Sequence, residues 1–109
     1  MDEGCVVVLV TAPGEAKAAE IGRALVEERL AACVNVVPAV RSIYRWEGRV
    51  EQAQEVLLVI KTRAQAFEAL RLRVLSLHPY QCPEIIALPV VAGHPAYLEW
   101  LAGSVQLTS

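Results

Sequence analysis

Hydrophobic runs and segments of helical periodicity alternate along this chain. Residues 6–10 form a continuous β-branched and leucine run, which predicts a strand covered on both faces. Pro13 and Gly14 interrupt it, and apolar residues then recur every three or four positions from Ala18 to Leu30. The chain therefore begins with a strand and an amphipathic helix that covers one face of a sheet.

The next segment predicts a β-hairpin. Residues 31–37 and 40–46 form one long strand interrupted at Pro38, because proline removes a backbone donor and is tolerated mainly at edges or bulges. A turn at Glu47-Gly48 leads into a second, strongly apolar strand over residues 50–62. We expect a long, bulged edge strand paired with a central strand.

A second helix is predicted after the hairpin. Thr62 and Gln65 have the spacing of a capping box, in which side chains satisfy the first backbone N–H groups of a helix. Apolar residues then recur at helical spacing over residues 67–77. We expect this helix to end at His78, because the residue before a proline disfavours helical geometry.

Two short elements complete the chain. Residues 85–91 are an apolar run of strand length, and Pro95 suits the first position of a terminal helix. The order βαββαβ plus a short helix predicts an α+β, ferredoxin-like sandwich in one domain over residues 1–109, with an antiparallel sheet and both main helices on one face. The bare second face and the long edge strand predict a closed homo-oligomer.

Composition supports self-association and disfavours other partners. Hydrophobic residues make up 55% of the chain and charged residues 20%, which is apolar for a protein of this size. No apolar run approaches the ~20 residues of a membrane-spanning helix. The net charge is −2, without clustered lysine or arginine. We therefore expect neither a membrane nor a nucleic acid as partner.

Three cysteines, Cys5, Cys33 and Cys82, leave one unpaired in any disulfide scheme. This count favours a reducing compartment, so we expect a cytoplasmic protein. Free cysteines are usually small buried hydrophobes, and that structural role is the simplest one for Cys33 and Cys82.

The stretch HPYQCPEIIALP, residues 78–89, gathers chemically versatile side chains. His78, Cys82 and Glu84 are residue types that bind transition metals. The prolines keep this segment extended, and no second ligand pair of recognisable spacing occurs elsewhere, so we expect no preformed zinc site within one chain. His78 equally suits a plain role at a helix C-terminus, where the helix dipole favours a cation.

Tyr44 and Trp46 alternate along the predicted edge strand, which puts both on one face and Ile43 and Arg45 on the other. Such aromatic residues are frequent interface anchors, and they equally suit cross-strand packing. The chain contains no G-x-S-x-G, H-E-x-x-H or Walker sequence, and its paired carboxylates suit a solvated surface. We therefore expect no enzyme.

Six stretches of the chain resemble the CutA family of divalent-cation tolerance proteins, namely TAP, LVEERLAACVNVVP, SIYRWEGRVE, EVLLVIKT, HPYQCPEIIALPV and YLEWL. They follow the family's order and span nearly the whole chain. The resemblance implies a ferredoxin-like fold assembled as a homotrimer through its long edge strands, similar to PII-type signalling proteins. It also implies a role in metal tolerance, with copper and other divalent ions as ligands and no firm enzymatic activity.

The copper site described for some family members is only partly matched. It uses a cysteine before TAP and two adjacent histidines before PY, and here Val10 and Leu77 stand at two of those positions. Only His78 remains, so we expect weak or trimer-built binding of a divalent ion such as Cu or Zn, with Cys33, Glu84 or another subunit supplying further ligands.

Other residues in the matching stretches are expected to line clefts between subunits, namely Tyr44, Trp46, Lys61 and Tyr80. The alternative function is therefore a PII-like sensor that binds a small anionic metabolite through Lys61 and backbone donors, without catalysis. A scaffold that binds a larger partner through its exposed aromatic residues is a further alternative.

Overall fold

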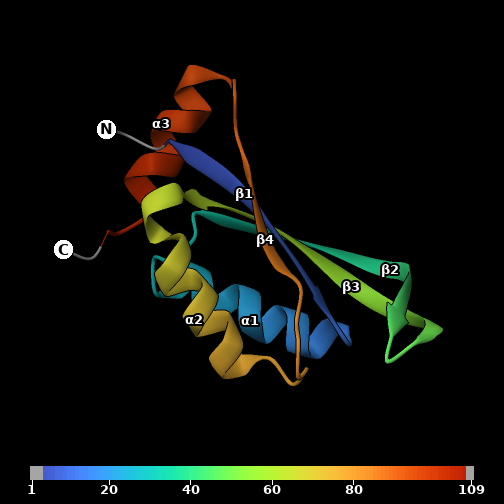
Figure 1. Ribbon diagram of the computed structural model, residues 1–109. Helices are drawn as coiled ribbons and strands as arrows, with labels where there is room; N and C mark the ends of the chain where they lie inside the picture. The colour runs from blue at the N-terminus through green and yellow to red at the C-terminus, as the bar shows by residue number, and fades with distance from the viewer. Residues whose placement is uncertain (1–3, 108–109) are drawn as a thin grey trace.

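The computed structural model describes residues 4–107, in which four strands form one antiparallel sheet in the order β2-β3-β1-β4. The inner strands are β1 (Cys5–Ala12) and β3 (Arg49–Arg63), and the edge strands are β2 (Cys33–Trp46) and β4 (Ile85–Pro89). Figure 1 shows α1 (Glu15–Glu27) and α2 (Phe67–Leu77) on one face of the sheet and α3 (Pro95–Ser104) at one end. The predicted βαββαβ order, the antiparallel sheet and the terminal helix are confirmed.

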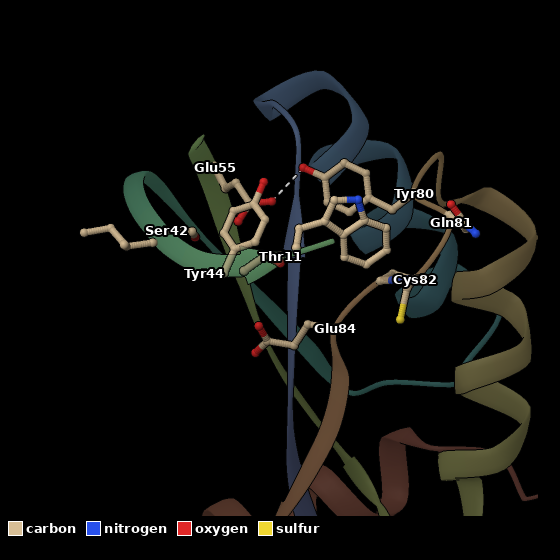
Figure 2. Close-up of a pocket in the computed structure, with 11 residues that line it drawn as sticks. Thr11, Ser42, Tyr44, Glu55, Tyr80, Gln81, Cys82 and Glu84 are labelled. Carbon is tan, nitrogen blue, oxygen red and sulfur yellow. Dashed lines mark hydrogen bonds between the residues drawn. The ribbon is translucent and has the colours of Figure 1, made fainter. Parts of the chain in front are cut away.

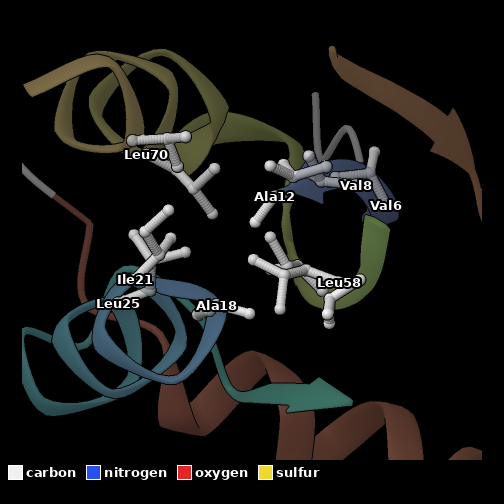
Figure 3. Packing of buried hydrophobic residues seen from close by; sticks show 13 residues of the cluster. Val6, Val8, Ala12, Ala18, Ile21, Leu25, Leu58 and Leu70 are labelled. Carbon is white, nitrogen blue, oxygen red and sulfur yellow. The ribbon is translucent and has the colours of Figure 1, made fainter. Parts of the chain in front are cut away.

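Side-chain alternation along the inner strands builds the core between the sheet and the two main helices. Val8 of β1 and Leu58 of β3 are fully buried, and they face Ile21 and Leu25 of α1 and Leu70 of α2 (Figure 3). Burial of each Leu or Ile side chain contributes about 1.5–3 kcal/mol. A second, smaller cluster forms where α3 packs on the end of the sheet, and it contains Ala32, Ala66, Leu101 and Val105.

The opposite face of the sheet, called the outer face below, is largely uncovered. The strand register places on it Val7, Leu9, Thr11, Cys33, Asn35, Val37, Leu57, Val59, Lys61, Ile86 and Leu88. None of these residues is fully buried, and Ile86 and Leu88 expose 49% and 47% of their surface. The sheet is therefore covered by its two main helices on one side only.

A bulge in β2 changes which residues face outward. Val37 pairs with Leu57 and Val40 pairs with Glu55, so three steps along β2 match two steps along β3. The extra residue lies at Pro38-Ala39, where the φ angle of Ala39 is 63°. Beyond the bulge the even-numbered residues face outward, which brings Ser42, Tyr44 and Trp46 to the same face as Glu55. The interruption predicted at Pro38 is confirmed.

Two local predictions are wrong. Thr62 does not cap a helix, because it lies within β3 with its side chain fully buried, and its hydroxyl donates to the Leu30 carbonyl at 2.6 Å. A short 3-10 turn, Ala64–Ala66, instead leads into α2. The last strand ends at Pro89 rather than at residue 91, because its partner strand β1 begins at Cys5, whose carbonyl accepts the Val90 N–H at 3.0 Å.

Candidate functional site

A pocket of about 640 Å³ opens where the outer face meets the connector between α2 and β4 (Figure 2). Its lining comes from three segments that are far apart in sequence. Thr11 lies one residue before the end of β1. Tyr44 and Glu55 belong to the β2–β3 hairpin beyond the bulge, residues 40–55, which is called the β2–β3 arm below. Residues 80–84 belong to the connector. The bulge in β2 contributes directly, because it turns Tyr44 and Trp46 toward this side of the sheet.

A hydrogen bond between Tyr80 and Glu55 crosses the pocket. The Tyr80 hydroxyl donates to Glu55 Oε2 at 2.6 Å, and the Glu55 residue is only 7% exposed (Figure 2). Burial, and then the adjacent Glu55 carboxylate, raise the pKa of Tyr80 well above its usual range. Tyr80 therefore keeps its proton and remains a donor at neutral pH.

His78 fixes the connector to the first strand. Its Nε2 lies 2.7 Å from the Thr11 carbonyl oxygen, and its Nδ1 accepts the Tyr80 backbone N–H at 3.2 Å. Because a carbonyl can only accept, Nε2 carries the hydrogen and the Nδ1 lone pair is already used. These contacts suit a neutral imidazole with both nitrogens engaged. The residue is buried and ends α2, as predicted, but the contacts do not favour a cation that caps the helix.

Cys33 and Lys61 lie on the outer face at the end that is remote from the pocket. They are cross-strand partners, and the Lys61 ammonium donates to Asn35 Oδ1. Lys61 is six residues along β3 from Glu55, a separation of about 20 Å. Tyr97 of α3 lies beside Cys33, and burial together with that thiol raises the pKa of Tyr97.

The predicted site residues therefore form two groups within one chain. Tyr44, Trp46, Tyr80 and Glu84 line the pocket, and His78 contacts it through Tyr80. Lys61 and Cys33 are not among the lining residues, so in one chain Lys61 does not meet Tyr80 and Glu84.

The three predicted metal ligands do not come together in one chain. His78 lies behind the pocket, Glu84 lines it and Cys33 lies on the other half of the sheet. Within residues 4–107 no group of three or more His, Cys, Asp or Glu side chains is placed to hold a metal ion. Protein metal sites of the zinc type use three or four protein ligands. The donors described in residues 4–107 therefore do not form a metal site by themselves.

Sequence reasoning missed Glu55, Thr11 and Ser42, which also line the pocket. A signal for Glu55 existed, because this glutamate directly precedes the apolar run of residues 56–60, and a carboxylate is costly to bury without a partner. Thr11 and Ser42 carried no comparable signal.

Comparison with known proteins gives consistent matches. The sequence pattern of the CutA1 divalent ion tolerance protein family matches residues 6–104. The divalent-cation tolerance protein CutA from Thermus thermophilus is 58% identical over 95 residues, which cover 87% of this chain and 92% of that protein. The solved structure of CutA1 from Oryza sativa has a TM-score of 0.94 at 42% identity and covers 98% of both chains. The PII-like protein CutA from Nostoc sp. PCC 7120 has a TM-score of 0.87 at 37% identity, covering 94% of this chain and 99% of that chain.

Relatives differ in length and in the compartment that their names give. Protein CutA, chloroplastic, from Arabidopsis thaliana is 46% identical over 101 residues, which cover 93% of this chain but 56% of that relative. This chain thus spans little more than half the length of that relative. A structure from Archaeoglobus fulgidus, 36% identical with a TM-score of 0.90 over 94% of this chain and 99% of that chain, is described as periplasmic. The cytoplasmic location inferred from the cysteines stays a prediction.

No helix within the described part of the chain is long and apolar enough to cross a bilayer. The matching family pattern extends from β1 to the end of α3, and the relatives share the architecture over nearly the whole length. The chain therefore belongs to the CutA1 divalent ion tolerance protein family.

Proposed function

We propose that this chain acts in divalent-cation tolerance as a homotrimer that binds divalent metal ions at sites completed between its copies. The observation that carries the proposal is the apolar outer face. Val37, Ile86 and Leu88 expose 40%, 49% and 47% of their surface there, while α1 and α2 cover only the opposite face. An apolar sheet face of this kind is unfavourable in water and marks a contact with another chain.

The two sheet edges support a closed ring of copies. Among residues 4–107, β2 pairs only with β3 and β4 pairs only with β1, so each of these strands has one edge without a strand partner in the described part of the chain. A free edge offers backbone donors and acceptors to another chain. Contacts between unlike surfaces of identical chains close into a ring when the rotation permits, and the family resemblance implies three copies.

The metal-binding part of the proposal depends on donors that one chain keeps apart. Glu84 is exposed and makes no hydrogen bond within residues 4–107, so its carboxylate is available to an ion. Cys33 is half-buried on the outer face, where a neighbouring copy would pack. His78 would have to give up a hydrogen bond to bind a metal. We therefore propose Glu84 and Cys33 as the first ligands and His78 as a third.

Calorimetric titration with Cu(II) and with Zn(II), combined with light scattering, tests this function. We expect a mass of three chains of 11.9 kDa and stoichiometric metal binding. Glu84→Gln and Cys33→Ala are expected to weaken binding, whereas Glu27→Gln on exposed α1 serves as the matched control. A monomer, or metal affinity that none of the site variants changes, would contradict the proposal.

A second candidate function is a PII-like sensor that binds a small metabolite without catalysis. The pocket supports it, because a volume of about 640 Å³ lies within the usual range for small-molecule sites. An anionic metabolite bound through Lys61 would require that lysine from another copy, since it is remote from the pocket of its own chain. Ligand binding to the native state raises the melting temperature, so thermal stabilisation in metal-free buffer tests this candidate. Unchanged melting with every metabolite assayed counts against it.

A further inference from the structure

We propose that Lys61 of a neighbouring copy enters the pocket between the β2–β3 arm and the α2–β4 connector, where its ammonium forms an ion pair with Glu84. The contact requires the assembly of copies under the proposed function, and the inference rests on that assembly. Three features of the chain carry it, namely the charges at the two ends of the outer face, the burial of Glu55 and the strand register of Cys33 and Lys61.

Two carboxylates without a cation lie at the pocket end of the outer face. Figure 2 shows Glu55 reaching the pocket from the β2–β3 arm and Glu84 from the connector. Neither carboxylate forms an ion pair with a residue in the range 4–107. Glu55 is only 7% exposed, and its hydrogen bond from Tyr80 brings no positive charge. A buried carboxylate without a nearby cation is destabilising, so this end of the face requires a positive charge.

The remote end of the same face carries a cation without an acid. The Lys61 ammonium donates to the neutral amide of Asn35 and forms no ion pair with a described carboxylate. Arg63, two residues further along β3, adds to the positive charge of this end. Arg49 lies nearer the hairpin tip, and its guanidinium is 3.6 Å from a carboxylate oxygen of Glu51. Lys61 is therefore the lysine of this face whose charge is still to be neutralised.

The charges of Lys61 and Glu84 cannot meet within one chain. Lys61 pairs with Val7 and Val7 pairs with Leu88, so Lys61 lies level with Leu88 and two strands away from β4. Glu84 precedes Leu88 by four residues, which gives a separation of roughly 16 Å between Lys61 and Glu84. Only another copy can bring an ammonium of this kind to the pocket.

Packing of copies through their outer faces brings these ends together. Contact between like ends would place Glu84 of one copy against Glu84 of the next, and like charges across an interface repel. Contact between unlike ends places each copy's Lys61 at the next copy's Glu84, and the same contact can repeat around a closed ring. The ammonium then also lies near the buried charge of Glu55. Charge complementarity therefore favours the arrangement in which unlike ends meet.

The strand register agrees with the site proposed above between copies. Cys33 and Lys61 are cross-strand partners on the outer face, so their Cα atoms lie about 5 Å apart. A copy that brings Cys33 to its neighbour's Glu84 therefore brings Lys61 to the same place. An ammonium and a divalent ion would compete for the Glu84 carboxylate, so the ion pair is measured in buffer with EDTA.

Charge reversal tests the ion pair, with light scattering over a dilution series and thermal unfolding as measurements. Glu84→Lys and Lys61→Glu each place like charges at every contact between copies. We expect each variant to dissociate at a chain concentration at least about tenfold higher than the parent and to melt at a lower temperature. The double variant Lys61→Glu/Glu84→Lys restores the pair in reverse and should recover most of both losses. Residues so far apart in one chain have additive effects, so recovery must arise between copies.

A second double variant is the matched control. Lys61→Glu/Glu27→Lys has the same net charge as the recovering variant, but it reverses an exposed acid on α1. We expect it to remain as weak as Lys61→Glu. Salt screens exposed ion pairs, so added salt should weaken the assembly of the parent more than that of Glu84→Gln or Lys61→Gln. The two glutamine variants keep the test decisive where a charge reversal prevents folding.

Several results would overturn the ion pair. These are additive losses in the double variant, equal recovery with Glu27→Lys, reversed charges that leave mass and melting unchanged, or the same salt dependence in the parent and both glutamine variants. A parent with the mass of one chain would remove the proposed homotrimer as well. A trimer with additive losses would overturn the ion pair alone, and the metal titration described above would still decide the metal function.

Discussion

Among the single residues around the pocket, Tyr80 is expected to make the stability of the fold depend on alkaline pH. Burial and the Glu55 carboxylate raise the pKa of Tyr80 above its usual value of about 10, so the folded chain holds this proton more tightly than the unfolded chain. The resulting stabilisation is complete below about pH 10 and is lost as the pH rises beyond it. We expect the parent to lose stability from pH 9 to pH 11 more steeply than Tyr80→Phe in urea unfolding. Tyr44→Phe is the matched control, and parallel curves for the parent and Tyr80→Phe would refute the assignment.

Thr62 is a second single residue that contributes to the stability of the fold. It is fully buried, and its hydroxyl satisfies the Leu30 carbonyl at 2.6 Å. Thr62→Val keeps the volume but leaves that carbonyl without its donor, which we expect to destabilise the fold by about 1–3 kcal/mol in denaturant unfolding. Thr62→Ser keeps the hydroxyl and loses one methyl group, so its cost should be smaller. A valine variant as stable as the serine variant would show that the hydrogen bond contributes little.

The role of a residue could be predicted from the sequence only where its neighbours in the chain determine that role. The sequence indicated that His78 could bind a metal or end a helix. It did not indicate the contact of His78 with the Thr11 carbonyl, because these residues are 67 positions apart. Thr62 was misread because the spacing of a capping box is visible in sequence, whereas the position of Thr62 inside β3 depends on its pairing with Val6. Glu55 was missed because its burial results from packing of the connector against the arm.

At the scale of elements, the turn at the tip of the β2–β3 hairpin contains a residue type that its backbone conformation disfavours. Glu47 and Gly48 have φ angles of 52° and 80°, and positive values at both central positions are typical of a type I′ turn. Glycine accepts this geometry freely, but a side chain such as glutamate is strained in it. We expect Glu47→Asn to stabilise the protein by roughly 0.5–1 kcal/mol in thermal unfolding, because asparagine tolerates positive φ. Glu47→Gln keeps the strain and should be neutral, and equal gains from both variants would exclude this reason.

The contact between α1 and β2 depends on a glycine. A Cβ atom added at Gly22 would lie 3.1 Å from Val34 Cγ1, closer than ordinary van der Waals contact. We expect Gly22→Ala to destabilise the fold by about 1 kcal/mol despite the better helix propensity of alanine. In a Val34→Ala background the obstructing methyl groups are absent, and the same change should stabilise by about 0.5–1 kcal/mol. A double-mutant cycle measures both values, and the same sign in both backgrounds would disprove the steric explanation.

The order of elements could be predicted because each has a strong periodicity of its own. The continuous run in β1, the alternation around Tyr44 and the helical spacing in α2 all survive in the structure. The bulge at Pro38 was also predictable, since proline disrupts a strand in a known way. The effect of the bulge on the site could not be predicted. The bulge moves Tyr44 and Trp46 to the outer face, and this follows from the register between β2 and β3, which is known only once the two strands are paired.

The whole molecule is more extended than a compact domain of its length. Its radius of gyration is 14.4 Å, against about 13 Å expected for 109 residues, and its longest dimension is 43 Å. The β2–β3 arm causes the difference, and Ile43 and Val50 on it expose 63% and 64% of their surface. An isolated two-stranded hairpin is marginal in water. We therefore expect the arm to pack against other copies of the chain. The high apolar content of the sequence agrees with this expectation.

If contacts between copies dominate stability, one charge on the outer face should separate the subunits. Leu88 lies on that face in β4 with 47% of its surface exposed, and Leu88→Glu would place a carboxylate in the proposed interface. We expect this variant to have a mass near 11.9 kDa by light scattering and to melt at a lower, concentration-independent temperature. Leu72→Glu is the matched control, because Leu72 is 53% exposed on α2, away from the outer face, and should leave mass and melting unchanged. A monomeric Leu88→Glu variant that melts as high as the parent would show that stability resides in the single chain, and an unchanged mass would show that the outer face is not the interface.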